Sequence, residues 1–169
     1  SFSEAFDRSR VICDFRFSIF ERAYFRDAKF INCRFDGAKF IDCNLKHATF
    51  YACDLKFVQF QRCLVDLEEI LASLPAEPNI RREALQNLRA NAMEIGDYAS
   101  QTRLVLQEVA AAKRHYTYAL SGYDSYYKKK YAGILAKLSA GLRLAGLHVS
   151  GLIWGHGEKA IRLVVSCVI

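Results

Sequence analysis

The sequence lacks the patterns that mark most catalytic and metal-binding sites. It contains no CxxC pair and no Cys/His spacing of a zinc site. Its four histidines, His47, His115, His148 and His156, are scattered and have no predicted serine, cysteine or carboxylate partner. The Gly-His-Gly stretch at 155–157 has neither the glycine pattern of a phosphate loop nor its Lys-Ser/Thr pair. We therefore expect no enzyme, no cofactor, no metal and no small-molecule substrate.

Long hydrophobic runs are also missing. No secretory signal peptide is visible, and the apolar stretch AIRLVVSCVI, at 160–169, is shorter than the ~20 residues that a membrane-spanning helix needs. Because a soluble terminus would expose its large apolar side chains, we predict that the stretch begins a transmembrane helix. The alternative is a last helix packed on the rest of the chain. The first residue is Ser1 rather than Met, so we expect that an upstream segment was removed.

The feature that the sequence does contain is a period of five. An aromatic residue or leucine recurs at every fifth position from Phe15 to Phe60, Val65 is a weaker last member, and a small residue stands two places before each. Positions two apart share a face of an extended chain, so each unit directs one small and one large side chain inward. Because five is odd, the chain must turn once per unit. The sequence therefore predicts a solenoid with a phenylalanine core.

Five of the six cysteines occupy the small inward position of this period. Packing explains them, because a free cysteine behaves as a small buried hydrophobe. Reduced thiols also suit a cytosolic compartment. Disulfides or a metal site remain the less favoured alternatives. The five residues are Cys13, Cys33, Cys43, Cys53 and Cys63.

The repeat resembles the pentapeptide-repeat family over about residues 13–65. The resemblance implies a right-handed, four-sided β-helix with four units per turn, in which residues twenty apart stack. The register fails before Cys13, so residues 1–12 are expected to form a cap or an irregular edge. Two inner columns are expected: Phe15, Phe35 and Leu55, and Phe20, Phe40 and Phe60.

Helices are predicted after residue 65. Residues 66–78 are expected to form a capping helix and linker, and residues 79–125 a helical hairpin that Asn79 caps and Gly96–Asp97 interrupts. Residues 126–154 are predicted to be one long amphipathic, juxtamembrane helix, and residues 155–169 the start of the possible transmembrane helix. The expected fold class is a right-handed quadrilateral pentapeptide-repeat β-helix, followed by an α-helical hairpin and a long amphipathic helix. The apolar side of the long helix comprises Ile134, Leu135, Leu138, Leu142, Ala145, Val149 and Leu152.

Positive charge and tyrosine gather toward the C-terminus. The net charges of residues 1–65, 66–112 and 113–169 are +3, −4 and +7. Basic residues mixed with aromatics can form a solvated helix face, a nucleic-acid surface or a membrane interface. Of these three interpretations, the apolar stretch at 160–169 favours the membrane interface. The candidate membrane-interface residues are Tyr126, Tyr127, Lys128, Lys129, Lys130, Lys137, Arg143 and Trp154.

A second resemblance covers EIGDYASQTRLVLQEVAAAKR and GHGEKAIRLVV. These stretches are similar to bacterial membrane proteins that place pentapeptide repeats and a helical hairpin before a two-helix, channel-like domain. His156 and Ala160 stand where those proteins commonly have Tyr and Pro, and no selectivity filter is present. The resemblance implies a module of an ion-channel-like protein, on the cytoplasmic side of the bacterial inner membrane. The matching residues are Gly96, Asp97, Glu108, Gly155, Gly157, Glu158 and Arg162.

We therefore expect a non-enzymatic interaction and oligomerisation module that contacts a protein partner or further copies of itself. The alternatives are a soluble pentapeptide-repeat adaptor or scaffold and, third, a nucleic-acid-binding protein that uses the tyrosine-rich basic segment. Mimicry of duplex DNA, a role of some pentapeptide-repeat proteins, is discounted because this coil is short and basic. We expect the wall that carries Ile31 and Tyr51 to be covered by the helical hairpin or by a partner. The candidate interaction residues, all outward in the register, are Ile31, Tyr51, Lys29, Phe17 and Phe57.

Overall fold

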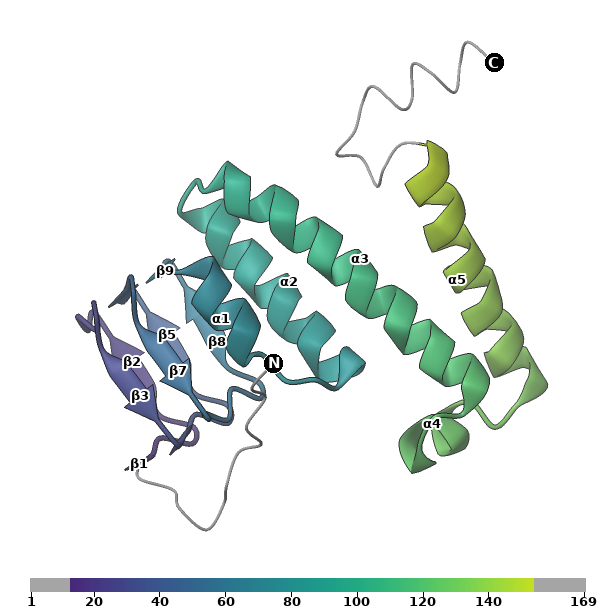
Figure 1. Cartoon of the computed structure of the whole chain (residues 1–169), viewed down its shortest axis with the longest axis horizontal. Helices are drawn as coiled ribbons and strands as arrows, with labels where there is room; N and C mark the ends of the chain where they lie inside the picture. Colours follow the sequence, from purple (N-terminus) through teal and green to yellow (C-terminus); the bar gives the residue numbers. More distant parts are fainter. Residues whose placement is uncertain (1–12, 154–169) are drawn as a thin grey trace. The chain divides into compact units, whose positions relative to one another are not determined.

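The computed structural model describes residues 13–153 (Figure 1). The chain divides into two compact units, Ser1–Leu104 and Val105–Ile169, and each unit is considered by itself below. The expected N-terminal cap at 1–12, the possible transmembrane segment at 155–169 and Trp154 lie outside the described residues.

The first unit begins with short parallel strands related by a shift of twenty residues. Pairing joins Phe20 to Phe40 and Phe40 to Phe60, and every other strand pair has the same shift. Four small sheets result, in the orders β1-β4, β2-β5-β8, β3-β7 and β6-β9. The chain visits them in turn, so the region is β-helix-like, with its strands side by side in Figure 1. The strands are β1 (Cys13–Asp14), β2 (Ile19–Glu21), β3 (Lys29–Ile31), β4 (Cys33–Arg34), β5 (Lys39–Ile41), β6 (Asn44–Leu45), β7 (Thr49–Tyr51), β8 (Gln59–Gln61) and β9 (Leu64–Val65).

A left-handed backbone turn separates each unit from the next. One residue in every five, always two places after the large inward residue, has a φ between +50° and +68°. Only Gly37 among them is a glycine, although this region costs other residues roughly 1–2 kcal/mol each. Hydrogen bonds between coils hold these turns, as from the Phe17 N–H to the Asp36 carbonyl at 2.9 Å. The predicted turn in each unit is confirmed.

Stacked phenylalanine rings fill the coil. Rings twenty residues apart are nearly parallel, with centroids 4.9 Å apart for Phe20 and Phe40 and 5.1 Å apart for Phe30 and Phe50. Rings of consecutive units meet edge to face, as Phe30 meets Phe35 at 5.2 Å. Both Phe35 and Phe40 are fully buried. Phe15 stacks on Phe35 and Phe40 on Phe60 in the same way, and Leu55 is buried, so the two predicted inner columns are confirmed.

Helices follow the strands along the chain, and the described part of the second unit contains helices alone. The second helix packs through one side, on which Ala84, Leu85, Leu88 and Ala92 are all buried. The helices are α1 (Leu67–Ser73), α2 (Pro78–Glu94), α3 (Tyr98–Ser121), α4 (Ser125–Lys130) and α5 (Ile134–Ile153).

Two details of the predicted helices are wrong. Asn79 does not cap the second helix: α2 already begins at Pro78, because the fixed φ of proline suits the first helical turn. The long helix predicted for 126–154 is two helices. The Asp124 carboxylate accepts a hydrogen bond from the Tyr127 N–H at 3.0 Å and starts α4, and Gly133 lies between α4 and α5.

Candidate interaction surfaces

One wall of the coil carries a checkerboard of opposite charges. We call it the ionic face; it contains β1, β4 and the bridge from Arg34 to Asp54. One column reads acid, base, acid from coil to coil, and the neighbouring column reads base, acid, base. Each charge therefore has opposite charges beside it and above it, and the six sum to zero. The columns are Asp14, Arg34 and Asp54, and Arg16, Asp36 and Lys56.

Contacts within the ionic face neutralise its charges locally. The Arg16 guanidinium donates to both Asp14 carboxylate oxygens, and its hydrogen bonds hold the pKa of Asp14 below its usual value. An ion pair of 3.5 Å joins Arg34 to Asp36. Burial, and next the nearby Asp36, raises the pKa of Asp54. The face thus offers paired charges and no excess of either sign.

Exposed apolar side chains border the ionic face on both sides. On one side, Ile31 and Tyr51 pair in register on β3 and β7, and both are about half exposed. On the other side, the turn residues Phe17 and Phe57 are 77% and 50% exposed. The Phe17 ring lies over Gly37, where a Cβ would come within 2.7 Å of it. The six charges of the ionic face therefore lie between two columns of exposed apolar side chains.

The predicted interaction residues all reach the surface of the described chain. Lys29 is exposed and pairs in register with Thr49, next to Ile31 on the same strand. Helical cover of this wall was one of the two expectations. In the first unit, α1 packs beside β7 and α2 beside β8, and the Ile31 and Tyr51 side chains stay about half exposed.

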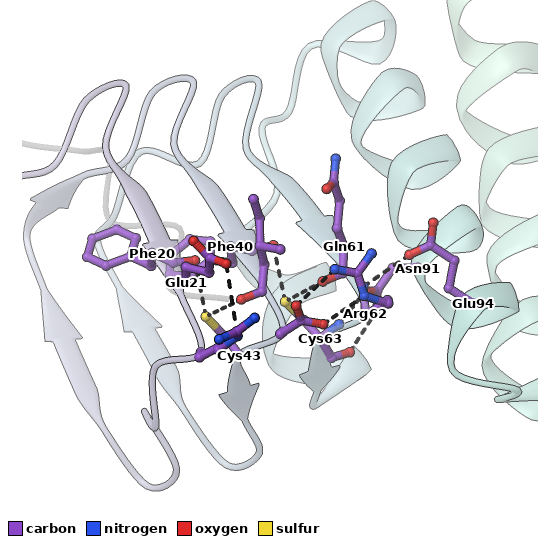
Figure 2. Close-up of polar contacts among 12 residues, drawn as sticks. Phe20, Glu21, Phe40, Cys43, Gln61, Arg62, Cys63, Asn91 and Glu94 are labelled. Atoms are coloured by element: carbon purple, nitrogen blue, oxygen red, sulfur yellow. Dashed lines mark hydrogen bonds and ion pairs between the residues drawn. The ribbon is translucent and has the colours of Figure 1, made fainter.

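Side chains of α2 close the edge of that last coil (Figure 2). The Asn91 amide accepts a hydrogen bond from the Cys63 N–H at 2.7 Å and donates one to the Cys63 carbonyl at 2.9 Å. Asn87, one helical turn earlier, bonds the Phe60 N–H at 2.7 Å in the same way. These amides take the place of a further coil. The backbone N–H and carbonyl groups of Phe60 and Cys63, at the open edge, therefore have hydrogen-bond partners. Sequence reasoning missed this role, since an asparagine within a helix carries no such signal.

The inward cysteines form a hydrogen-bonded ladder. The thiols of Cys43, Cys53 and Cys63 each lie 3.2–3.4 Å from the carbonyl oxygen of the phenylalanine 23 residues earlier. Figure 2 shows two of these contacts, those of Cys43 and Cys63. The Ser73 hydroxyl repeats this contact from α1, donating to the Phe50 carbonyl at 3.0 Å.

The chemistry of these thiols is that of packing groups. The cysteines at 13, 33, 43, 53 and 63 are free. Burial raises the pKa of Cys53 to about 12 and also raises that of Cys63. A high thiol pKa disfavours the thiolate, which is the reactive form. Cys167 lies outside the described residues.

The second unit contains a buried cluster of histidine and tyrosine. The two ring nitrogens of His115 lie 3.0 Å from the hydroxyls of Tyr127 and Tyr131. A neutral imidazole has one donor and one acceptor, so His115 donates to one hydroxyl and accepts from the other. Burial raises the pKa of Tyr127 to about 12. The sequence suggested no partner for His115, since these three residues meet only through helix packing.

The predicted membrane-interface residues divide between surface and core. Tyr127 is buried, so its ring faces the interior of the unit rather than a headgroup region. Tyr126 is exposed and accepts a hydrogen bond from Lys130 at 2.7 Å. The Arg143 guanidinium donates to the Tyr116 hydroxyl at 3.4 Å. The other lysines of this set are exposed: Lys128, Lys129 and Lys137.

Residues 13–153 contain neither a candidate membrane span nor a candidate metal site. None of their helices is long and apolar enough to cross a membrane. Within the same residues, no group of three or more histidine, cysteine or acidic side chains could hold a metal ion.

The comparisons with known proteins agree with the period of the coil. Pentapeptide repeats match residues 13–46 and 28–64, in eight copies. No curated protein and no solved structure matches the chain. The matched residues coincide with the strands, the stacked rings and the left-handed turns. The chain therefore contains a region of pentapeptide repeats across residues 13–64.

Proposed function

We propose that the chain is a non-enzymatic protein-interaction module, and that the ionic face with its two apolar borders is the docking surface. The pentapeptide repeats themselves suggest an interaction role. We further propose that the β-helix-like region is a right-handed, four-sided coil. The twenty-residue shift and the four sheets visited in turn support four sides.

The observation that carries the proposal is the exposure of Phe17 and Phe57. Both residues occupy left-handed turns, where a bulky residue is unfavourable, and neither side chain lies in the core. The core of the coil therefore does not require phenylalanine at either position. Exposed aromatic side chains beside arginines resemble the anchors that dominate protein interfaces. With Tyr51 on the other border, the face has apolar anchors around paired charges.

The charges indicate which kind of partner fits. Three basic and three acidic side chains on the ionic face cancel, so a polyanion would meet no positive field there. Tyr116 and Tyr127, two of the tyrosines that could stack bases, are buried. The arrangement thus favours a protein with apolar pockets and a polar surround over a nucleic acid. The nucleic-acid alternative has no comparable support from the described residues.

The membrane location is also a proposal. We propose that the module works at the cytoplasmic side of a bacterial inner membrane, as an oligomer. The apolar stretch at 160–169 and the exposed lysines of α4 support it. Fractionation of cells that express the full-length gene tests it, and recovery of the protein only in the soluble fraction would exclude it.

Site-specific photocrosslinking tests the docking surface. A photoreactive phenylalanine analogue replaces Phe17 or Tyr51 in the full-length protein, in the cells that produce it. Matched controls carry the analogue at Tyr24 and Tyr98, which are 71% and 78% exposed and lie off this face. We expect one protein partner to be crosslinked from both test positions and from neither control.

A loss-of-binding variant completes the test. Ile31→Glu with Tyr51→Glu adds charge to exposed positions, so the coil should stay folded while the crosslink from Phe17 is lost. If the adducts from test and control positions are the same, or if the double variant keeps its crosslink, the face is not the docking surface.

A further inference from the structure

Helix α5 has two opposite apolar faces, and only one of them is packed. Ala140 is fully buried in the core of the second unit, with Leu144 and Leu147 partly buried against it. The apolar side that the sequence singled out points the other way and is exposed. At 3.6 residues per turn, its centre lies roughly 180° around the helix from Ala140. The exposed members are Ile134 (86%), Leu135 (81%), Leu138 (58%), Leu142 (68%), Ala145 and Val149 (52%).

The exposed residues have the spacing of a coiled-coil seam. Steps of three, four, three and four residues lead from Leu135 to Val149. The five residues from Leu135 to Val149 follow the a/d pattern of a heptad, and the exposed Ile134 lies beside Leu135 at one end. We call these five residues the α5 seam. Because α5 is already held by its opposite face, no helix has to form when the seam pairs.

The residues beside the seam favour a close approach by another helix. Ser139 and Gly146 flank it on one side and Gly141 on the other, and all three are small. An added Cβ at Gly146 would meet no atom within 4 Å. Small residues therefore border the seam along much of its length, so that another helix can approach it closely.

The absence of charged side chains from the α5 seam favours a second copy of the seam as its partner. Helix α5 carries only two charged side chains, Lys137 and Arg143, and no acidic one. Both lie toward the packed side, roughly 60° from Ala140, and Arg143 is bonded to Tyr116. Two copies of the seam can therefore meet without bringing like charges together, whereas a partner that recognises charge would find none on it.

We propose that the α5 seam pairs with the α5 seam of a second copy of this chain. The same patch on both subunits is self-complementary, as a two-fold interface requires. The inference takes from the proposed function only that the chain is an interaction module, and it uses none of the residues of the ionic face. A seam ~21 Å long is smaller than a standard interface, so the pairing should be concentration-dependent.

The test measures the mass of the full 169-residue chain in solution over a range of concentrations. We expect a monomer–dimer equilibrium. Leu138→Glu with Leu142→Glu should weaken association at least about tenfold, because these positions lie at the centre of the seam. Leu106→Glu, at an exposed leucine of α3, should leave association unchanged. A second double variant, Leu138→Lys with Leu142→Lys, should weaken it to the same extent.

Mixing the acidic and basic double variants separates pairing from misfolding. If both fold and α5 meets α5, the mixture should form a heterodimer that neither variant forms alone. A native chain that stays monomeric, a dimer that the double variants leave intact, or a mixture without heterodimer would overturn the proposal. Sedimentation with vesicles of phosphatidylethanolamine and phosphatidylglycerol is the last arm: a monomer that binds them through the α5 seam would assign the seam to a membrane surface instead.

Discussion

The Asn91 side chain completes both backbone hydrogen bonds of Cys63, at 2.7 Å and 2.9 Å, although the two residues are 28 positions apart. Both Asn91 and Cys63 are buried. The helix therefore supplies, through one amide, the donor and the acceptor that another coil would have supplied. Stability of the last coil should depend on this amide.

Asn91→Leu should lower the free energy of unfolding by about 2–3 kcal/mol, because it leaves a buried N–H and carbonyl without partners. Urea unfolding followed by circular dichroism measures the change. The matched control is Gln107→Leu, which removes an exposed amide from α3 and should change stability by less than about 0.5 kcal/mol. Equal effects of the two changes would mean that the Asn91 contact does not hold the coil.

Phe35→Ala should cost about 3–5 kcal/mol of unfolding free energy, because the stacked rings around it cannot close the cavity. Phe57→Ala, at a half-exposed turn, should cost less than about 1 kcal/mol. The two changes remove the same atoms, so urea denaturation of both variants isolates the effect of burial. A Phe57→Ala variant as unstable as Phe35→Ala would contradict the inward and outward assignment.

Ala52→Gly should stabilise the protein by about 0.5–1 kcal/mol. Its φ of +50° lies in the left-handed region, where alanine is disfavoured, and relief of that strain exceeds the added entropy of the unfolded chain. The control is Ala48→Gly, which removes a buried methyl group in ordinary backbone and should destabilise by about 1 kcal/mol. Thermal unfolding compares the two, and the predicted changes have opposite signs.

Stability should fall at alkaline pH through the inward thiols. Burial raises the pKa of Cys53 from an ordinary value of 9.0 to about 12, so between these values the folded chain binds more protons than the unfolded chain. The contribution of Cys53 is complete below pH 9 and is lost as the pH rises toward 12. Unfolding in urea at a series of pH values measures the slope.

Cys53→Ala should make that alkaline loss of stability smaller, and Ser18→Ala, which changes a small inward residue without a thiol, should not. In a chain that also carries Cys167→Ser, Cys53 and Cys63 should react with a thiol reagent only after denaturation. Rapid reaction of either thiol in the native protein at neutral pH would contradict the burial of the ladder.

The period of five could be interpreted from the sequence because it is local and repeated. Each unit obeys the same rule, so the inward columns, the turn in every unit and the packing role of the cysteines followed without knowledge of the helices. The left-handed φ at residues such as Phe17 and Arg22 could not be predicted in the same way, since neither is a glycine. Only the coil, which closes a hydrogen bond at each corner, requires that conformation.

The candidate surfaces were predicted in part. The outward positions of Ile31, Tyr51, Phe17 and Phe57 follow from the register, and the structure places them all at the surface. The alternation of charge that they border depends on which residues lie twenty apart, a shift that the pentapeptide resemblance implied. The interior position of Tyr127 could not be predicted, because it depends on how α3, α4 and α5 pack.

The sequence by itself determined the coil and the presence of an apolar stripe on the last helix. Tertiary structure alone decided where that helix faces. Periodicity finds apolar residues on both sides of α5 and cannot rank them. Packing selects the side of Ala140, which is buried with Tyr116, Ala119 and Tyr127 while Leu144 and Leu147 pack against the same core. The leucines of the α5 seam remain outside because they lie on the opposite side of the helix.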